Sequence, residues 1–306
     1  MSKLPLIEKY RPKTLDEIIS QVNNIKILKQ SLHHGQLPHM LFYGPAGSGK
    51  TSTILALAKD YYGEHYKEMI LELNGSDDRG INIIRTQIKY FSKIKNLLIP
   101  DKPKIIILDE ADSLTYDAQF ALRRVMEKFT TNVRFCLICN YLNKLIPAIH
   151  SRCTLLRFST IKSEDMYSKL LQIIEAEKLK IPKKKLEMII ELSMGDFRKN
   201  LNFIEQNKID EFKYFLGVER ETYKEIETML KMSNKNYKDT KNKLENIFIK
   251  NKISFHELLK LISIIAFKLK LYKLISKLAS LEYKFYLGTN LFESIYFDYL
   301  ILILIQ

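Results

Sequence analysis

Gly44-Pro45-Ala46-Gly47-Ser48-Gly49-Lys50-Thr51 lies between two apolar segments of different periodicity. Residues 40–43 before it are a short apolar run typical of a buried strand, and from Ser52 to residue 58 the pattern is that of a helix. The eight residues match G-x-x-x-x-G-K-[ST] in the strand, loop and helix context that this pattern requires. Backbone N–H groups of such a loop, together with the helix N-terminus, bind phosphate. The segment therefore predicts a nucleoside triphosphate site.

Two carboxylates complete the predicted chemistry. Asp109 and Glu110 follow the apolar residues 105–108, which places them at the carboxyl edge of a sheet beside the phosphate loop. Lys50 is expected to reach the β- and γ-phosphates, and Thr51 and Asp109 to hold Mg²⁺ directly or through water. Glu110 would orient and deprotonate the attacking water. Alone, an Asp-Glu pair after a strand is usually a helix cap, but beside a phosphate loop it favours hydrolysis.

Composition limits the class of protein. The 306 residues allow about two or three domains, and the net charge of +14 favours a polyanionic partner such as nucleic acid, although a lysine-rich proteome would give the same value. No apolar run is long enough for a membrane span, and no secretory signal is visible. Cys136 and Cys139 have zinc-like spacing, but they belong to an apolar strand and lack further ligands nearby. We expect no metal site there, and three cysteines suggest a reducing compartment.

Strand-like segments at residues 40–43, 69–73, 104–110, 133–139 and 154–158 alternate with helical patterns. This alternation predicts a doubly wound α/β domain over residues 1–159, with its chemistry at the carboxyl ends of the strands. Thr14 or Asp16 is expected to cap a helix that runs to about residue 32. After Ser159 only helical patterns remain, and they divide into 160–218 and 219–306. The apolar tail at 300–305 is expected to dock in a helical core or at a subunit interface.

Several motifs resemble one family. Residues 109–112 together with the phosphate loop are similar to the nucleotide motifs of AAA+ clamp-loader ATPases. Residues 8–12, 73–81, 135–141, 151–153 and 195–198 resemble boxes of the replication factor C small subunits, and residues 134–153 and 287–290 resemble the fifth-subunit type in particular. The resemblance runs in order over residues 8–205 and thinly through the C-terminus. Ala46, Ser48 and Gly75 replace the usual proline, threonine and alanine, and Phe197 and Asn200 also depart from the family.

This resemblance implies an AAA+ P-loop parallel-sheet core, a small helical lid domain and a C-terminal helical collar domain. It implies that an adenine pocket is lined by Tyr10, Arg11 and Pro12. Asn140 would sense the γ-phosphate, where the residues alone indicate only a turn at a strand end. Arg198 would reach the phosphates of its own subunit. Arg152 would reach the ATP of an adjacent subunit as an arginine finger, which requires it to be accessible. Without the family, both arginines would be interpreted as ordinary surface residues.

Basic residues after the second strand form a further candidate site. Arg79, Arg85 and Lys89 can bind phosphates without reading bases, and family members track duplex DNA in this way. A solvated basic face is the alternative. The predicted helix at residues 117–129 would, by resemblance, present one end to the sliding clamp (PCNA), with Gln119 and Arg123 linking clamp and DNA contacts to the ATP site.

The resemblance therefore implies an ATP- and Mg²⁺-dependent small subunit of replication factor C. The resemblance implies a nuclear hetero-pentamer with four other replication factor C subunits, which opens the sliding clamp and loads it on primer-template DNA, without a membrane partner. One alternative is a scaffold subunit that binds nucleotide without hydrolysing it, although the intact Lys50, Thr51, Asp109 and Glu110 argue against this. A different AAA+ DNA machine, such as a homo-hexameric branch-migration helicase, is another. The same subunit could also serve loaders with a different large subunit.

Overall fold

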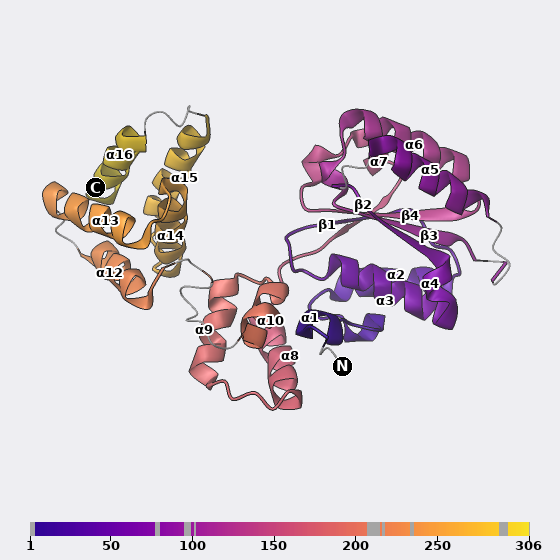
Figure 1. Ribbon diagram of the computed structural model, residues 1–306, viewed down its shortest axis with the longest axis horizontal. Helices are drawn as coiled ribbons and strands as arrows, with labels where there is room; N and C mark the ends of the chain where they lie inside the picture. Colours follow the sequence, from indigo (N-terminus) through magenta and orange to yellow (C-terminus); the bar gives the residue numbers. More distant parts are fainter. Residues whose placement is uncertain are drawn as a thin grey trace. The chain divides into compact units, whose positions relative to one another are not determined.

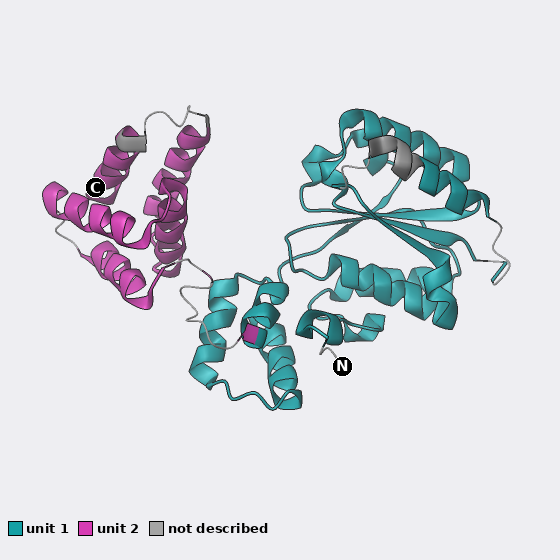
Figure 2. Ribbon diagram, viewed as in Figure 1, with its two compact units in different colours: residues 1–205 teal, residues 206–306 magenta. Residues whose placement is uncertain are grey.

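The chain folds into two compact units, residues 1–205 and 206–306 (Figure 2). The computed structural model describes residues 4–76, 80–94, 99–100, 102–206, 215, 218–232, 236–287 and 293–305. The first unit contains the predicted core, 1–159, and most of the predicted lid, 160–218. The second contains the predicted collar, 219–306. The separation of core from lid stays a prediction, because both lie largely within one unit.

A five-stranded parallel sheet organises the first unit, which confirms the predicted α/β class (Figure 1). Its strands lie in the order β2-β3-β4-β1-β5, and each neighbouring pair is parallel. The strands are β1 (Met40–Tyr43), β2 (Ile70–Asn74), β3 (Lys104–Asp109), β4 (Val133–Cys139) and β5 (Thr154–Arg157). Since β1 lies beside β4 and β4 beside β3, the residues that follow these three strands meet at one edge of the sheet.

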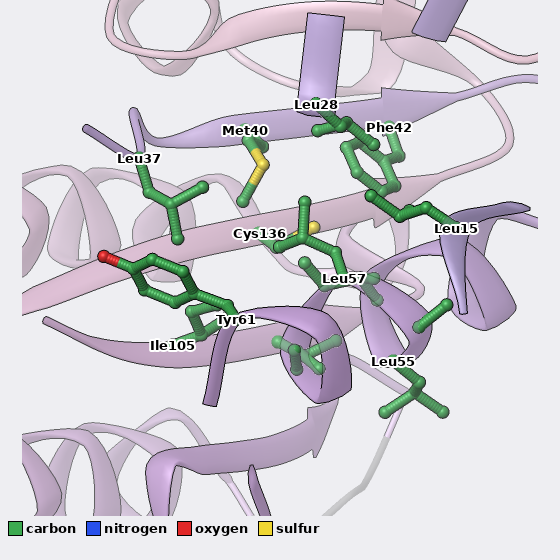
Figure 3. Packing of buried hydrophobic residues seen from close by; sticks show 14 of the residues in the cluster. Leu15, Leu28, Leu37, Met40, Phe42, Leu55, Leu57, Tyr61, Ile105 and Cys136 are labelled. Atoms are coloured by element: carbon green, nitrogen blue, oxygen red, sulfur yellow. The ribbon is translucent and has the colours of Figure 1, made fainter. Parts of the chain in front are cut away.

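Helices cover both faces of this sheet (Figure 1). The helices of one face are α2 (Val22–His33), α3 (Lys50–Tyr62) and α4 (Tyr66–Met69), and those of the other are α5 (Gly80–Lys93), α6 (Tyr116–Phe129) and α7 (Pro147–His150). Met40 and Phe42 of β1 pack with α3 in one buried cluster, part of which Figure 3 shows, whereas Leu41 belongs to the cluster on the opposite face. Burial on both faces explains the near-continuous apolar runs of the strands.

The helix predicted from Thr14 to about residue 32 is wrong in its first part. Leu15–Glu17 is a 3₁₀ turn, Ser20 has a left-handed φ of 63°, and α2 begins only at Val22. Tertiary contacts determine this path. The N–H of Leu15 donates to Asp60 Oδ2 (2.9 Å), and the Gln21 amide donates to the carbonyl of Ser159 (2.8 Å). Local propensity was overridden by hydrogen bonds to segments distant in sequence.

Three helices follow β5 within the first unit, namely α8 (Ser163–Ala176), α9 (Lys183–Ser193) and α10 (Phe197–Gln206). Their apolar faces are buried, for example Leu170 and Phe203. The N-terminal α1 (Leu6–Lys9) is joined to these helices, because the N–H of Leu6 donates to Glu205 Oε1 (3.3 Å). The N-terminal segment thus contacts the predicted lid although it is distant from it in sequence.

The second unit is helical in its described residues. Its helices are α12 (Arg220–Lys231), α13 (Tyr237–Asn251), α14 (Phe255–Lys268), α15 (Tyr272–Leu287) and α16 (Glu293–Ile305). The helix α14 contacts α12 and α15, and α16 contacts α13 and α15. Leu300, Ile301 and Leu304 are buried, so most of the apolar tail packs within this helical unit, while Leu302 is exposed. None of the described helices has both the length and the apolar character needed to cross a bilayer.

His39, which precedes β1, makes local stability depend on pH. Its Nδ1 accepts a hydrogen bond from the N–H of Phe135 (3.1 Å), and burial, assisted by the charge of Arg134, lowers the pKa of His39 to about 4. Below about pH 6.5 the unfolded chain takes up the proton first, so stability falls until the pH reaches about 4. We expect a loss of about 1 kcal/mol near pH 5, a value reduced because the ring is partly exposed.

Hydrogen exchange of the β1 and β4 amides over this pH range, corrected for intrinsic exchange, measures the loss. The His39→Gln variant keeps a hydrogen-bond acceptor that does not titrate, so its protection should be nearly independent of pH. Equal pH dependence in both proteins would contradict the assignment to His39.

Candidate functional site

The phosphate loop connects β1 to α3 and encloses the Lys50 ammonium group. Lys50 is only 8% exposed, and its Nζ donates to the carbonyls of Gly44 (2.8 Å) and Pro45 (2.8 Å) and to Asn140 Oδ1 (2.9 Å). Desolvation lowers the pKa of Lys50, and the charge of Arg198 acts in the same direction, while that of Asp109 opposes it. The loop therefore holds a largely buried cation where a phosphate is expected, and a polyanion would offset its desolvation.

Thr51 and Asp109 form the predicted pair of Mg²⁺ ligands. The Thr51 hydroxyl donates to Asp109 Oδ2 (2.8 Å), and the N–H of Glu110 donates to Asp109 Oδ1 (2.9 Å). Hydroxyl and carboxylate oxygens are the donors that Mg²⁺ prefers, so the pair fits this ion. Glu110 is exposed and has left-handed backbone angles, φ 51° and ψ 40°. Strained residues of this kind cluster at functional sites.

The loop after β2 lies close to the loop after β3, which contains this strained residue. Gly75 follows β2, and its N–H donates to the carbonyl of Asp109 (2.7 Å). A Cβ at Gly75 would lie 2.5 Å from the carbonyl oxygen of Glu110, so a side chain there would require the two backbone segments to move apart. The glycine that departs from the family pattern therefore lies directly against the backbone of the predicted catalytic glutamate.

Asn140 is positioned by a residue that the sequence had indicated only as part of a motif. Asp112 Oδ2 accepts hydrogen bonds from the N–H groups of Asn140 (3.2 Å) and Tyr141 (3.1 Å). The loop after β3 thus holds the end of β4, and the side chain of Asn140 reaches Lys50. The run 109–112, which follows β3, consequently also fixes the residues at the end of β4.

A cavity of about 590 Å³ gathers most of the predicted nucleotide residues. The predicted residues that line it are Tyr10, Arg11, Pro12, Ala46, Gly47, Ser48, Gly49, Lys50, Thr51, Ser52, Asp109, Glu110, Asn140 and Arg198. Gly44 and Pro45 contribute through the carbonyls that bind Lys50. The Nε of Arg11 is buried without a hydrogen-bond partner among the described residues, so a donor is available beside the loop. The size of this cavity, its charge and its hydrogen-bond donors fit a nucleoside triphosphate.

The lid helices supply residues that sequence reasoning missed. Glu177, at the end of α8, accepts a hydrogen bond from the Tyr10 hydroxyl (2.7 Å) and pairs with the Lys9 ammonium. The Tyr10–Glu177 hydrogen bond raises the pKa of Tyr10. Lys169 of α8 also lines the cavity. No local signal could have identified these residues, because they face the site only once α8 has packed.

Asp196 links the lid to the phosphate loop. Its Oδ1 accepts from the N–H groups of Arg198 (3.1 Å) and Lys199 (3.2 Å), which fixes the carboxylate at the start of α10. A Cβ at Gly47 would lie 2.0 Å from this oxygen, and Gly47 has a φ of +69°. The loop and the lid can therefore approach this closely only because residue 47 is glycine.

We expect Gly47→Ala to weaken nucleotide binding at least tenfold, because the added methyl group separates Asp196 from the loop. A tenfold change in affinity corresponds to about 1.4 kcal/mol of binding free energy. Titration with a fluorescent nucleotide measures the affinity. Gly35→Ala is the matched control: Gly35 has a similar φ of +66°, but nothing lies within 4 Å of its added Cβ. An equal loss in both variants would assign the effect to backbone strain alone.

Arg152 lies at the amino ends of the strands, opposite the end of the sheet that carries the phosphate loop. It precedes β5 and lines a second cavity, of about 1060 Å³, together with residues 36–39 before β1 and Asn132 before β4. Its side chain is 30% exposed and pairs with Glu127 of α6. The residue is thus accessible, and it lies at the amino ends of strands whose carboxyl ends carry the phosphate loop.

The predicted DNA and clamp residues are only partly described. Arg79 lies outside the described residues, as does most of the segment 287–290. Arg85 belongs to α5, and Lys89 is exposed on the same helix. Gln119 is 1% exposed and ties α6 to the following segment, with Nε2 donating to the carbonyl of Lys144 (3.0 Å) and Oε1 accepting from the N–H of Ile146 (2.8 Å). The DNA and clamp assignments stay predictions.

Comparison with known proteins agrees with this geometry. The chain is 39% identical to replication factor C subunit 5 of Homo sapiens over 299 residues, which is 94% of this chain and 88% of the human protein. The chain belongs to the replication factor C subunit family. Replication factor C subunit 5 of Arabidopsis thaliana is also 39% identical, over 94% of this chain and 83% of the plant protein. The predicted relation to the fifth-subunit type is thereby confirmed.

Similarity to the family is uneven along the chain. Replication factor C subunit 3 of Saccharomyces cerevisiae is 49% identical, but over 205 residues, which is 67% of this chain and 60% of the yeast protein. The family model of ATPases associated with various cellular activities (AAA) matches residues 40–160, which contain the phosphate loop and the strand-end residues described above. This replication factor C subunit therefore has an AAA ATPase domain.

Solved structures support the fold. The branch-migration motor RuvB of Thermotoga maritima superposes with a TM-score of 0.52 at 19% identity, covering 72% of this chain and 79% of the RuvB chain. At this identity the likeness concerns the fold alone.

Proposed function

We propose that this subunit hydrolyses ATP within the replication factor C clamp loader. The loader would comprise this chain and four other replication factor C subunits. It would act in the nucleus, where it opens the ring-shaped sliding clamp and loads it on primer-template DNA. Family membership supports the proposal that the chain assembles with other subunits, and the cavity around Lys50 supports the proposal that it binds ATP.

One observation carries the proposal. The phosphate-binding residues and Arg152 occupy two different cavities, at the carboxyl and the amino edge of the same sheet respectively. A group at the amino edge is unsuited to the nucleotide of its own subunit, but it can complete the site of a neighbour. Each subunit would then contribute half of two ATP sites, and hydrolysis would require assembly.

The residues of the cavity would divide the work as follows. Lys50 and the loop N–H groups bind the phosphates, Thr51 and Asp109 hold Mg²⁺, and Glu110 orients and deprotonates the attacking water. When bound, Mg²⁺ offsets the negative charge that develops on the phosphate oxygens. Asn140, held by Asp112 and hydrogen-bonded to Lys50, lies where it can respond to the γ-phosphate. Arg198 of α10 links the same phosphates to the lid.

DNA contact is proposed for the start of α5. This helix carries Arg85 and the exposed Lys89, and Arg79 precedes it in sequence. Contacts of this type bind phosphates and are independent of base sequence. In an assembled spiral, corresponding helices of successive subunits would follow one duplex.

Reconstitution tests the proposal. We expect the chain alone to show almost no ATPase activity. Co-expression with four related subunits should give a complex whose mass corresponds to one copy of each and whose ATPase is stimulated by the sliding clamp and primer-template DNA together. A homo-hexamer would instead favour another AAA+ DNA machine. A pentamer whose turnover is unaffected by Glu110→Gln would favour the scaffold subunit.

A further inference from the structure

The accessible Arg152 is held by its own subunit through three contacts. Its Nη1 donates to the carbonyl of Ala148 (2.7 Å) and to the Ser151 hydroxyl (3.4 Å), and its Nη2 pairs with Glu127 Oε1. A guanidinium group has five N–H donors, and within the described part of the chain these contacts leave Nε–H and one N–H of Nη2 for another acceptor. The side chain is oriented but not saturated.

Arg152 differs from two other cations of its cavity, Lys104 and Arg134. Lys104 donates to the carbonyl of Ile94 (2.9 Å), and Arg134 donates to that of Thr130. Both carbonyls lie at helix ends, where Lys and Arg commonly satisfy carbonyl groups that lack a partner within the helix. Lys104 and Arg134 thus donate to carbonyl groups, whereas Arg152, which lines the same cavity, pairs with a carboxylate.

The carboxylate itself is shared between two arginines. Glu127 Oε1 also accepts from Arg123 Nε (3.2 Å), one turn earlier on α6. Hydrogen bonds from Arg123 and Arg152 hold the pKa of Glu127 below its usual value, so it remains charged at neutral pH. With two cations and one anion the cluster keeps a net positive charge. Glu127 therefore orients Arg152 without cancelling the charge that a triphosphate would meet.

We propose that Glu127 is a positioning residue for Arg152, which it holds at the amino edge of the sheet in the orientation that meets the triphosphate of an adjoining subunit. This inference rests on the proposed function. A free arginine side chain loses rotamer entropy when it is fixed, and prior orientation removes part of that loss from the catalytic step. Because Glu127 belongs to α6, it also makes the finger dependent on the position of that helix.

The test uses the reconstituted complex with Glu127→Gln in this chain. The amide keeps the shape of the side chain but loses the charge that strengthens the hydrogen bond to Arg152. We expect kcat at the completed site to fall about tenfold with KM for ATP unchanged, since the neighbouring subunit binds the nucleotide. Glu127→Asp should recover part of the loss. Glu227→Gln is the matched control, because Glu227 is also paired at i,i+4, with Lys231, but lies in the second unit.

A double variant separates positioning from a structural effect. If Glu127 acts through Arg152, Glu127→Gln combined with Arg152→Ala should be no slower than Arg152→Ala alone. The inference would be overturned if the loss in the double variant equalled the product of the two single losses. It would also be overturned if Glu127→Gln turned over ATP faster than the wild type. The inference would also be wrong if Glu127→Gln left ATP turnover at the wild-type rate while Arg152→Ala slowed it. Wild-type turnover of Arg152→Ala would instead overturn the proposed function. Native mass measurement of each complex ensures that assembly is intact.

Discussion

Arg152→Ala should lower ATP turnover at the site that Arg152 is proposed to complete by a factor on the order of 10³, the lower end of the range for arginine fingers. In the proposed function, the guanidinium group would donate charge-assisted hydrogen bonds to phosphate oxygens mainly in the transition state, where negative charge develops on them. The measurement uses a complex in which only the neighbouring subunit keeps its phosphate-loop lysine, so that a single site is observed.

Arg157→Ala is the matched control for this loss. Arg157 is exposed at the end of β5, five positions beyond Arg152, and does not line either of the two cavities described above. Its replacement should leave turnover unchanged. Full activity of Arg152→Ala would show that the accessible arginine at the amino edge is an ordinary surface residue.

Glu110→Gln should abolish most hydrolysis at this subunit's own site. A positioned general base contributes about 10²- to 10⁴-fold, and glutamine cannot accept the proton from water. Nucleotide affinity should remain close to that of the wild type, because Lys50, Thr51 and Asp109 keep their contacts. Single-turnover hydrolysis and fluorescent-nucleotide binding measure the two quantities separately.

The exposed Glu68→Gln on α4 is the control for this second substitution, since it removes the same charge away from the cavity. Loss of nucleotide binding in Glu110→Gln would mean that the strained loop around this residue had collapsed, not that a base had been removed. Because Arg152 and Glu110 are proposed to serve different sites, their effects should appear in different subunit pairs, which mixed complexes can resolve.

Predictions of the strands from local pattern were confirmed. The phosphate loop, the strands and the two carboxylates after β3 each depend on residues that are adjacent in sequence. Parallel pairing then brings the ends of β1, β3 and β4 together, which is why Lys50 and Asp109 could be assigned to one site before the fold was known, whereas Asn140 was assigned to it by resemblance to the family. The predicted helix from Thr14 failed because hydrogen bonds to Asp60 and Ser159 determine that segment.

The partners of these residues could not be predicted. Glu177 holds Tyr10 across 167 positions, and Glu127 holds Arg152 across 25. Asp196 meets Gly47 only when the lid helices have packed near the phosphate loop. Charged residues on helix surfaces are common, and nothing in their spacing distinguishes those that contact a functional side chain from those that face water.

By itself the sequence predicted the chemistry proposed for this protein: a phosphate loop, a pair of carboxylates and a parallel sheet follow from residues close together in the chain. Only the tertiary structure decided which side chains orient them and that Arg152 lies at the opposite edge from Lys50. The physical reason is that backbone geometry and hydrophobic period act over a few residues, whereas hydrogen bonds and ion pairs between distant segments form only after the elements have packed.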